Sequence, residues 1–171
     1  MKKKALVALL SASLVAVFFL HIEWTSTENG ILLIIDGREI DFFGTVNNQV
    51  NRLTRSCNAV TRLTPSQEKY YIALSLIKNY SPPNSMSAMI ASAWTVESWT
   101  LVEVEFADLL PAVVLIQTNE NQSYIVPNAV WSGYTIPWKS APYIRQYISR
   151  NGVGVPQSLT ECFEPKSQSF Q

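Results

Sequence analysis

Two glutamates offer the clearest chemistry in this sequence. Glu103 and Glu105 are two residues apart in the alternating segment 99–106, so both side chains lie on the same face of an expected strand. Two carboxylates that lie side by side repel each other, and such pairs can serve acid–base chemistry or bind a cation. Alternating glutamates are also an ordinary feature of the solvent face of a half-buried sheet. We expect both carboxylates to face water and keep them as candidate binding residues.

Aromatic side chains offer a second kind of site. Trp131, Tyr134 and Trp138 lie in a segment punctuated by Gly and Pro, where rings can stay exposed and stack on a sugar or a peptide. Trp94 and Trp99 belong to the alternating segments before it, where core packing is the more common role of a tryptophan. The three aromatic residues of the later segment are therefore candidate binding residues.

The residues needed for familiar catalytic machinery are sparse. Ser66 and Lys69 have the spacing of a serine that is activated by a lysine one helical turn on, but Ser75 and Lys78 match equally well and no Lys-Thr-Gly follows. The single histidine, His21, excludes His-based triads, and one His with two Cys excludes zinc and iron–sulfur centres of these ligands in a monomer. The residues favour binding over catalysis, and we expect no cofactor and no metal.

The N-terminus indicates where the chain resides. Three lysines at positions 2–4 precede an uncharged apolar run over residues 5–22, which is typical of an export signal or a membrane anchor. The run spans about 27 Å as a helix, near the hydrocarbon thickness of a bilayer. Small residues suited to cleavage are missing just after it, so we favour an uncleaved anchor over residues 1–22. Trp24 then lies at the far membrane interface, and the protein is anchored in the inner membrane facing the periplasm. With a cleaved signal it is periplasmic or secreted.

Composition describes the rest of the chain as one folded domain. The sequence has 171 residues with 47% hydrophobic and 15% charged, which suits a core-forming domain over residues 23–164 and excludes disorder. Residues 1–22 contain three Lys and no Asp or Glu, so the remainder has 10 basic and 13 acidic residues and a net charge of −3. This charge argues against a nucleic-acid partner.

The two cysteines are predicted to form a disulfide. Cys57 continues the apolar stripe of an expected helix, so its thiol points inward, and Cys162 lies in an apolar segment after the last expected helix. An even number of cysteines in an exported domain favours a bridge, and this one stabilises by up to about 5 kcal/mol. The alternative is two separate buried thiols.

Two helices are predicted in the first half of the domain. The first has an apolar stripe at helical spacing, formed by Val46, Val50, Leu53, Cys57 and Val60. Arg52, Arg55 and Arg62 fall off the stripe and are expected to be solvated, the alternative being a docking patch. The second begins at Thr64 with a capping box completed by Gln67 and runs to about residue 80, where two prolines stop it.

Strands and a last helix complete an α+β pattern. Asp36-Gly37 predicts a short hairpin, and alternation from residue 86 onward predicts an antiparallel meander of about four strands. A final helix is expected from Ser140 to Asn151, ended by Gly152. Residues 165–171 are expected to form a flexible tail.

This order of elements is similar to the cystatin-like or nuclear-transport-factor-like α+β roll. The last two-thirds of the chain also resembles small uncharacterised exported bacterial proteins. The matching motifs are Trp131-Ser132-Gly133, Pro137-Trp138-Lys139, Tyr143-Ile144-Arg145 and Gly154-Val155-Pro156. The resemblance implies a curved sheet that wraps a helix, and it brings no activity and no functional residues. Roll-like folds serve many functions, so it does not choose one.

We expect a cell-envelope protein that is membrane-anchored through residues 5–22 and acts as an extracytoplasmic binding or assembly module with an envelope protein partner. The acidic strand segment and the aromatic segment 131–138 motivate this hypothesis. The alternative is a pocket enzyme or small-ligand carrier built in the mouth of the roll. A deep polar pocket that contains a buried carboxylate would favour the alternative.

Overall fold

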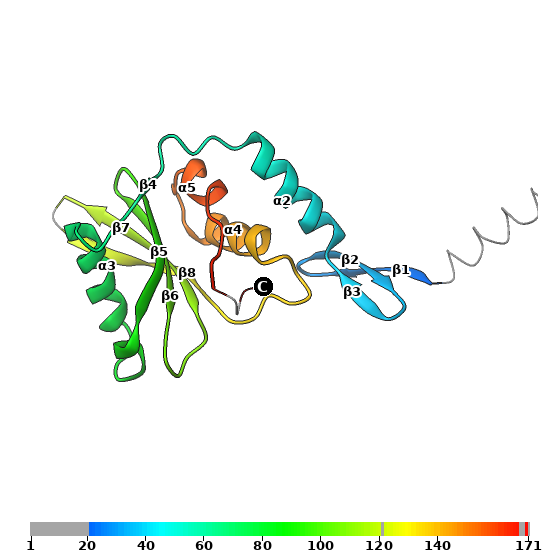
Figure 1. Ribbon diagram of the computed structural model, residues 1–171, viewed down its shortest axis with the longest axis horizontal. Coiled ribbons are helices and arrows are strands. Elements are labelled where there is room, and N and C mark those ends of the chain that lie inside the picture. Colours follow the sequence, from blue (N-terminus) through cyan, green and yellow to red (C-terminus); the bar gives the residue numbers. More distant parts are fainter. Residues whose placement is uncertain (1–20, 121, 168–169, 171) are drawn as a thin grey trace, which may run out of the picture.

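The computed structural model describes residues 21–120, 122–167 and 170. In this part the chain forms two antiparallel sheets and four α-helices, which confirms the α+β class (Figure 1). No helix in the described ranges is both long and apolar enough to cross a membrane. The anchor predicted over residues 1–22 lies almost entirely outside the described residues.

The first sheet is a three-stranded unit next to the N-terminus. It contains β1 (Ile22–Thr27), β2 (Gly30–Ile35) and β3 (Arg38–Ile40) in sequential order. Asp36 and Gly37 both have positive φ, as the tight turn of a hairpin requires, so the hairpin predicted at this dipeptide is confirmed. Strand β1 was not predicted: its first residue, Ile22, was assigned to the apolar run, and residues 23–27 were assigned to no element.

The second sheet is a five-stranded antiparallel meander. Its order is β4 (Thr61–Arg62), β5 (Met89–Val96), β6 (Trp99–Glu105), β7 (Ala112–Asn119) and β8 (Gln122–Ser132). The prediction of about four sequential antiparallel strands is therefore confirmed, with the short β4 as the extra member. Leu63 donates its backbone N–H to the carbonyl of Ala93, which extends this edge beyond β4.

Helices cover both faces of this sheet. Helix α3 (Glu68–Lys78) packs on one face through Ala73 and Ile77, while α4 (Ser140–Asn151) and α5 (Gln157–Glu161) pack on the other (Figure 1). Successive residues of β6 consequently enter different cores, Leu101 with α4 and α5 and Val102 with α3. The sheet thus lies between two helical layers. The predicted bounds of α4 agree with the structure, and α3 begins four residues after Thr64.

The C-terminal segment packs on the same face as α4 and α5. Phe163 and Phe170 are each 1% exposed and belong to the core cluster on that face. Ser167, between them, is also buried. Of the segment 165–171, which was expected to form a flexible tail, Ser167 and Phe170 are thus buried, and Phe170 gains apolar burial that a frayed end would forgo.

Candidate functional site

Helix α2 (Phe42–Thr54) presents its apolar side to solvent. Val46, Val50 and Leu53 are 44%, 53% and 79% exposed, whereas Asn48 on the other side is 4% exposed. The predicted stripe exists, but it points outward, the reverse of the usual arrangement of an amphipathic helix. We call Phe43, Val46, Val50 and Leu53 the outer face of α2. The helix ends at Thr54, so it does not extend to Val60 as predicted.

Polar contacts hold the opposite side of α2 against the body of the protein. The guanidinium of Arg145 in α4 donates to the side-chain oxygen of Asn48 at 3.0 Å and to the backbone carbonyl of Phe163 at 2.8 Å. Arg145 is 7% exposed, so its charge requires these partners. Arg145, the last residue of the motif Tyr143-Ile144-Arg145, thus connects α2, α4 and the C-terminal segment.

Glu164 completes this cluster as the partner of three arginines. Arg52 contacts its two oxygens at 3.1 Å each, and Arg55 and Arg145 donate to Oε1 at 2.8 Å. Burial opposes ionisation of Glu164, but the hydrogen bonds and positive charges of the arginines outweigh it and hold its pKa below the ordinary value. Arg52 remains solvated as expected, with 51% of its side chain exposed beside Glu164, whereas the expectation is wrong for Arg55, whose side chain is 19% exposed.

The predicted disulfide between Cys57 and Cys162 is confirmed. The two Cα atoms are 5.8 Å apart, and the bridge joins residues separated by 105 positions. Cys57 lies in the loop after α2 and not on the helix, so the bridge fixes the end of α2 to the residue that precedes Phe163. Covalent and ionic links therefore hold α2 with its apolar side outward.

Glu103 is fully buried, so the expectation that it faces water is wrong. Its oxygens accept the backbone N–H of Lys166 at 2.8 Å and of Ser167 at 2.7 Å, and the hydroxyl of Ser92 at 3.0 Å. The alternation along β6 places Glu103 on the face that α4, α5 and the C-terminal segment cover. Glu105 ends the strand and is only partly buried. The two carboxylates do not form a paired site.

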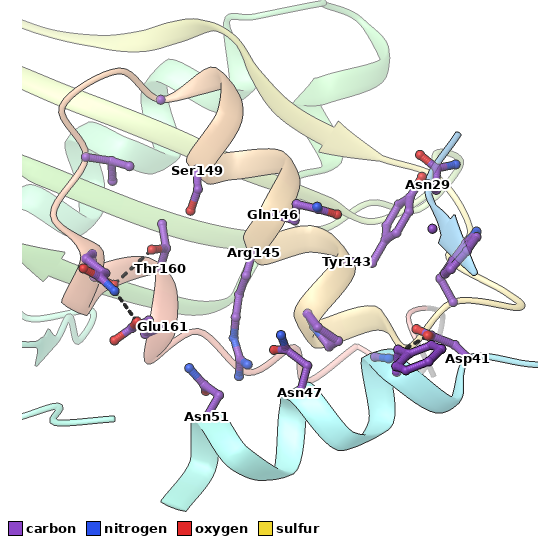
Figure 2. A pocket seen from close by; sticks show the side chains of 18 of the residues that line it. Asn29, Asp41, Asn47, Asn51, Tyr143, Arg145, Gln146, Ser149, Thr160 and Glu161 are labelled. Carbon is purple, nitrogen blue, oxygen red and sulfur yellow. Dashed lines mark hydrogen bonds between the residues drawn. The ribbon is translucent and has the colours of Figure 1, made fainter. Parts of the chain in front are cut away.

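A polar groove of about 710 Å³ lies between α2, α4 and α5. Its uncharged polar lining includes Asn47 and Asn51 of α2, Gln146 and Ser149 of α4, and Gln157 and Thr160 of α5 (Figure 2). Both carboxylate oxygens of Asp41 accept backbone N–H groups, from Gly44 and Lys139. Within the described part of the chain, the buried side-chain oxygen of Asn51 has no donor. Three charged residues, Asp41, Arg145 and Glu161, also line the groove, and each is hydrogen-bonded within the protein. The groove therefore offers mainly uncharged hydrogen-bonding groups to a ligand.

The three aromatic candidates occupy different environments. Trp131 in β8 packs edge-on against Tyr143 and Tyr147, with ring centroids 5.1 and 5.2 Å apart, so it largely serves the core. Trp138 stacks on Tyr143 at 6.0 Å and forms one wall of the groove. Tyr134 is 67% exposed and does not line the groove. The structure does not bring the three residues into one stacking surface.

A separate aromatic cluster lies where the small sheet meets α2. Trp24 of β1 packs against Phe43 at 5.7 Å between ring centroids, and Phe42 packs against Phe43 at 5.6 Å. All three rings are about half exposed, at 55%, 51% and 45% for Trp24, Phe43 and Phe42. This aromatic cluster joins the outer face of α2 to the start of the described chain.

Comparison with known proteins gives no matching family model, no matching curated protein and no matching solved structure. Among the described residues, no group of three or more His, Cys, Asp or Glu side chains could hold a metal ion. The outer face of α2, the aromatic cluster and the groove are therefore interpreted from their own geometry.

Proposed function

We propose that this protein is a membrane-anchored assembly module that faces the periplasm and docks an envelope partner on the outer face of α2. The observation that carries the proposal is the orientation of α2, with Val46, Val50 and Leu53 exposed and Asn48 buried. Scattered apolar residues on a surface are ordinary, but a continuous apolar row is typical of an interaction site.

The contacts beneath α2 support the view that this orientation is its working state. Turning the helix inward would break the Arg52–Glu164 and Arg55–Glu164 ion pairs and leave the buried Arg145 without Asn48. The buried Arg145 would lose one of its hydrogen-bond partners, which costs on the order of 1–3 kcal/mol. The disulfide opposes the same movement. A partner that covers the outer face can therefore bind without rearranging the domain.

The membrane location is supported by three independent features. The lysines at positions 2–4 and the apolar run of residues 5–22 suit an uncleaved anchor. The aromatic cluster around Trp24 follows that run directly, where amphipathic rings favour a membrane interface. The disulfide is typical of an oxidising compartment outside the cytoplasm.

Native electrophoresis of the envelope tests the docking function. Leu53→Glu places a charge on the outer face, and Val153→Glu places the same charge at a site that is 89% exposed outside α2. Neither residue is buried, so the free energy of unfolding of both variants should lie within about 0.5 kcal/mol of that of the natural protein. We expect Leu53→Glu alone to shift the protein from a larger assembly to the monomer. An unchanged assembly in Leu53→Glu would contradict the proposal.

The groove favours small-ligand binding as a second candidate function. The amide side chains of Asn47 and Asn51 and the stacked wall of Trp138 and Tyr143 suit an uncharged sugar or peptide. A thermal-shift screen of neutral sugars and short peptides tests this function, with Asn51→Leu as the control variant. A compound that stabilises the natural protein and not the variant would support the function, and a screen without such a compound would count against it.

A further inference from the structure

The residues of the outer face follow a seven-residue repeat. Phe43, Val46, Val50 and Leu53 are separated by three, four and three positions. This is the spacing of positions a and d in a pair of coiled helices, with Phe43 and Val50 at a and Val46 and Leu53 at d. A helix that packs on a globular core usually has a wider apolar face. The outer face is therefore as narrow as the contact strip, or seam, of a helix pair, which suits the packing of one further helix.

The rest of the helix surface fits this frame. Asn48 and Arg52 occupy positions f and c, which lie away from the partner in a helix pair, and here they contact the body of the protein. Val46, Val50 and Leu53 consequently remain exposed while the back of the helix is engaged, and Phe43 at the start of the seam packs against Trp24. A second helix can approach Val46, Val50 and Leu53 without displacing the polar contacts that hold α2.

The flanks of the seam indicate which helix fits. In paired helices, charges at positions e and g select the partner by attraction or repulsion. The corresponding residues of α2 are Phe42, Asn47, Gln49 and Thr54, none of which is charged. Two identical helices can therefore meet here without repulsion, and no charge pattern on α2 selects a different helix.

We propose that the occupant of the outer face is a second copy of this chain, with the two α2 helices side by side and parallel. This inference rests on the proposed function, because anchoring in one membrane brings two copies together with their α2 helices on the same side of the bilayer. Val at position a with Leu at position d, as in Val50 and Leu53, favours parallel two-stranded pairing. In such a pair, Val50 contacts the partner's Val50.

The length of the helix determines the conditions in which the pair forms. The 13 residues of α2 span about 20 Å, which is short for a pair that is stable by itself. Anchoring in a membrane raises the effective concentration of the second copy, as tethering does for any weak contact. We therefore expect dimers in the membrane and dissociation when the protein is diluted in detergent.

Crosslinking of the full-length protein in membranes tests this pairing. Val50→Cys adds one thiol to the seam while the native disulfide is retained, and Tyr71→Cys adds one to a 58% exposed position on α3. With a short bismaleimide, we expect an adduct of twice the chain mass from Val50→Cys and none from Tyr71→Cys. Mass spectrometry of the adduct should identify residue 50 of both chains at the link.

Other results would overturn the pairing. Equal dimer formation from both cysteine variants, or none from Val50→Cys, contradicts it. An adduct of Val50→Cys with a different protein would also contradict the claim that the occupant is a second copy of this chain, but it would be consistent with the docking function. Failure of the docking function itself is recognised separately, by an assembly that Leu53→Glu does not change.

Co-purification of a tagged and an untagged chain from membranes gives a second readout. Val50→Glu in both chains should abolish recovery of the untagged chain, because two carboxylates would meet at the seam. Val50→Ile keeps a β-branched residue at position a and should preserve recovery. Equal recovery from the Glu and Ile variants would overturn the pairing.

Discussion

Glu103 joins the central sheet to the C-terminal segment by accepting two backbone N–H groups in a fully buried position. Glu103→Gln places an amide donor or a single neutral acceptor against those two donors. We expect a loss of about 2 kcal/mol in the free energy of unfolding, measured by urea denaturation. Glu105→Gln, on the partly buried neighbour, is the matched control and should change it by about 0.5 kcal/mol or less. Equal effects of the two variants would contradict the assigned role.

Glu164 gives the protein an acid-sensitive contact. Its pKa is lowered in the folded state, so its contribution to stability is complete above the ordinary glutamate pKa of about 4.3 and disappears as pH falls through the lower folded value. We expect Glu164→Gln to destabilise the protein near neutral pH and to approach the natural protein in strong acid. Thermal unfolding of both proteins from neutral to acidic pH measures this convergence. A difference that stays constant across that range would contradict the ionic role.

The surroundings of Glu103 and Glu105 were harder to predict than the strand that contains them. The period of two along β6 correctly placed Glu103 and Glu105 on one face of a strand, but it could not say what covers that face. The backbone groups that cover Glu103 belong to Lys166 and Ser167, which are more than 60 positions away. The sequence around these two residues has no helix or strand periodicity that would indicate their position. The apolar Phe163 and Phe170 were the one signal in the sequence that this segment packs.

Helix α2 is held to the domain by polar contacts and by the disulfide that follows it. Replacing both Cys57 and Cys162 by Ser removes the link across 105 positions, and we expect the protein to lose up to about 5 kcal/mol. Hydrogen exchange should show the larger loss of protection in α2 and a smaller one in β6 and β7, because the core of the sheet does not depend on the bridge. A uniform loss over all elements, or none in α2, would contradict this account.

Element types and several bounds followed from local sequence, but the orientation of α2 did not. Capping and turn residues predicted α4 and the hairpin at Asp36-Gly37, since these depend on neighbours in the chain. The apolar row and the polar row of α2 have the same helical period, so periodicity alone cannot say which row faces the domain. Arg145 and Glu164, which are distant in sequence, select the polar row.

The whole molecule combines this domain with the N-terminal apolar run. We expect the mature protein to keep residues 1–22 and to sediment with membranes, because the residues after the run are poorly suited to cleavage. Intact-mass measurement of protein isolated from the envelope checks this. A mature N-terminus between Glu23 and Gly30 would show a cleaved signal and a protein that is free of the membrane.

The central claim is that the outer face of α2 is covered when the protein is in its envelope. The direct measurement compares maleimide labelling of Val46→Cys in intact envelopes and in dilute purified protein, with Val153→Cys as the control. These sites are 44% and 89% exposed in the isolated chain, so both should react readily after purification. We predict that, in the envelope, Val46→Cys is protected from maleimide labelling and Val153→Cys is not. Equal labelling of both sites in the envelope would contradict the account.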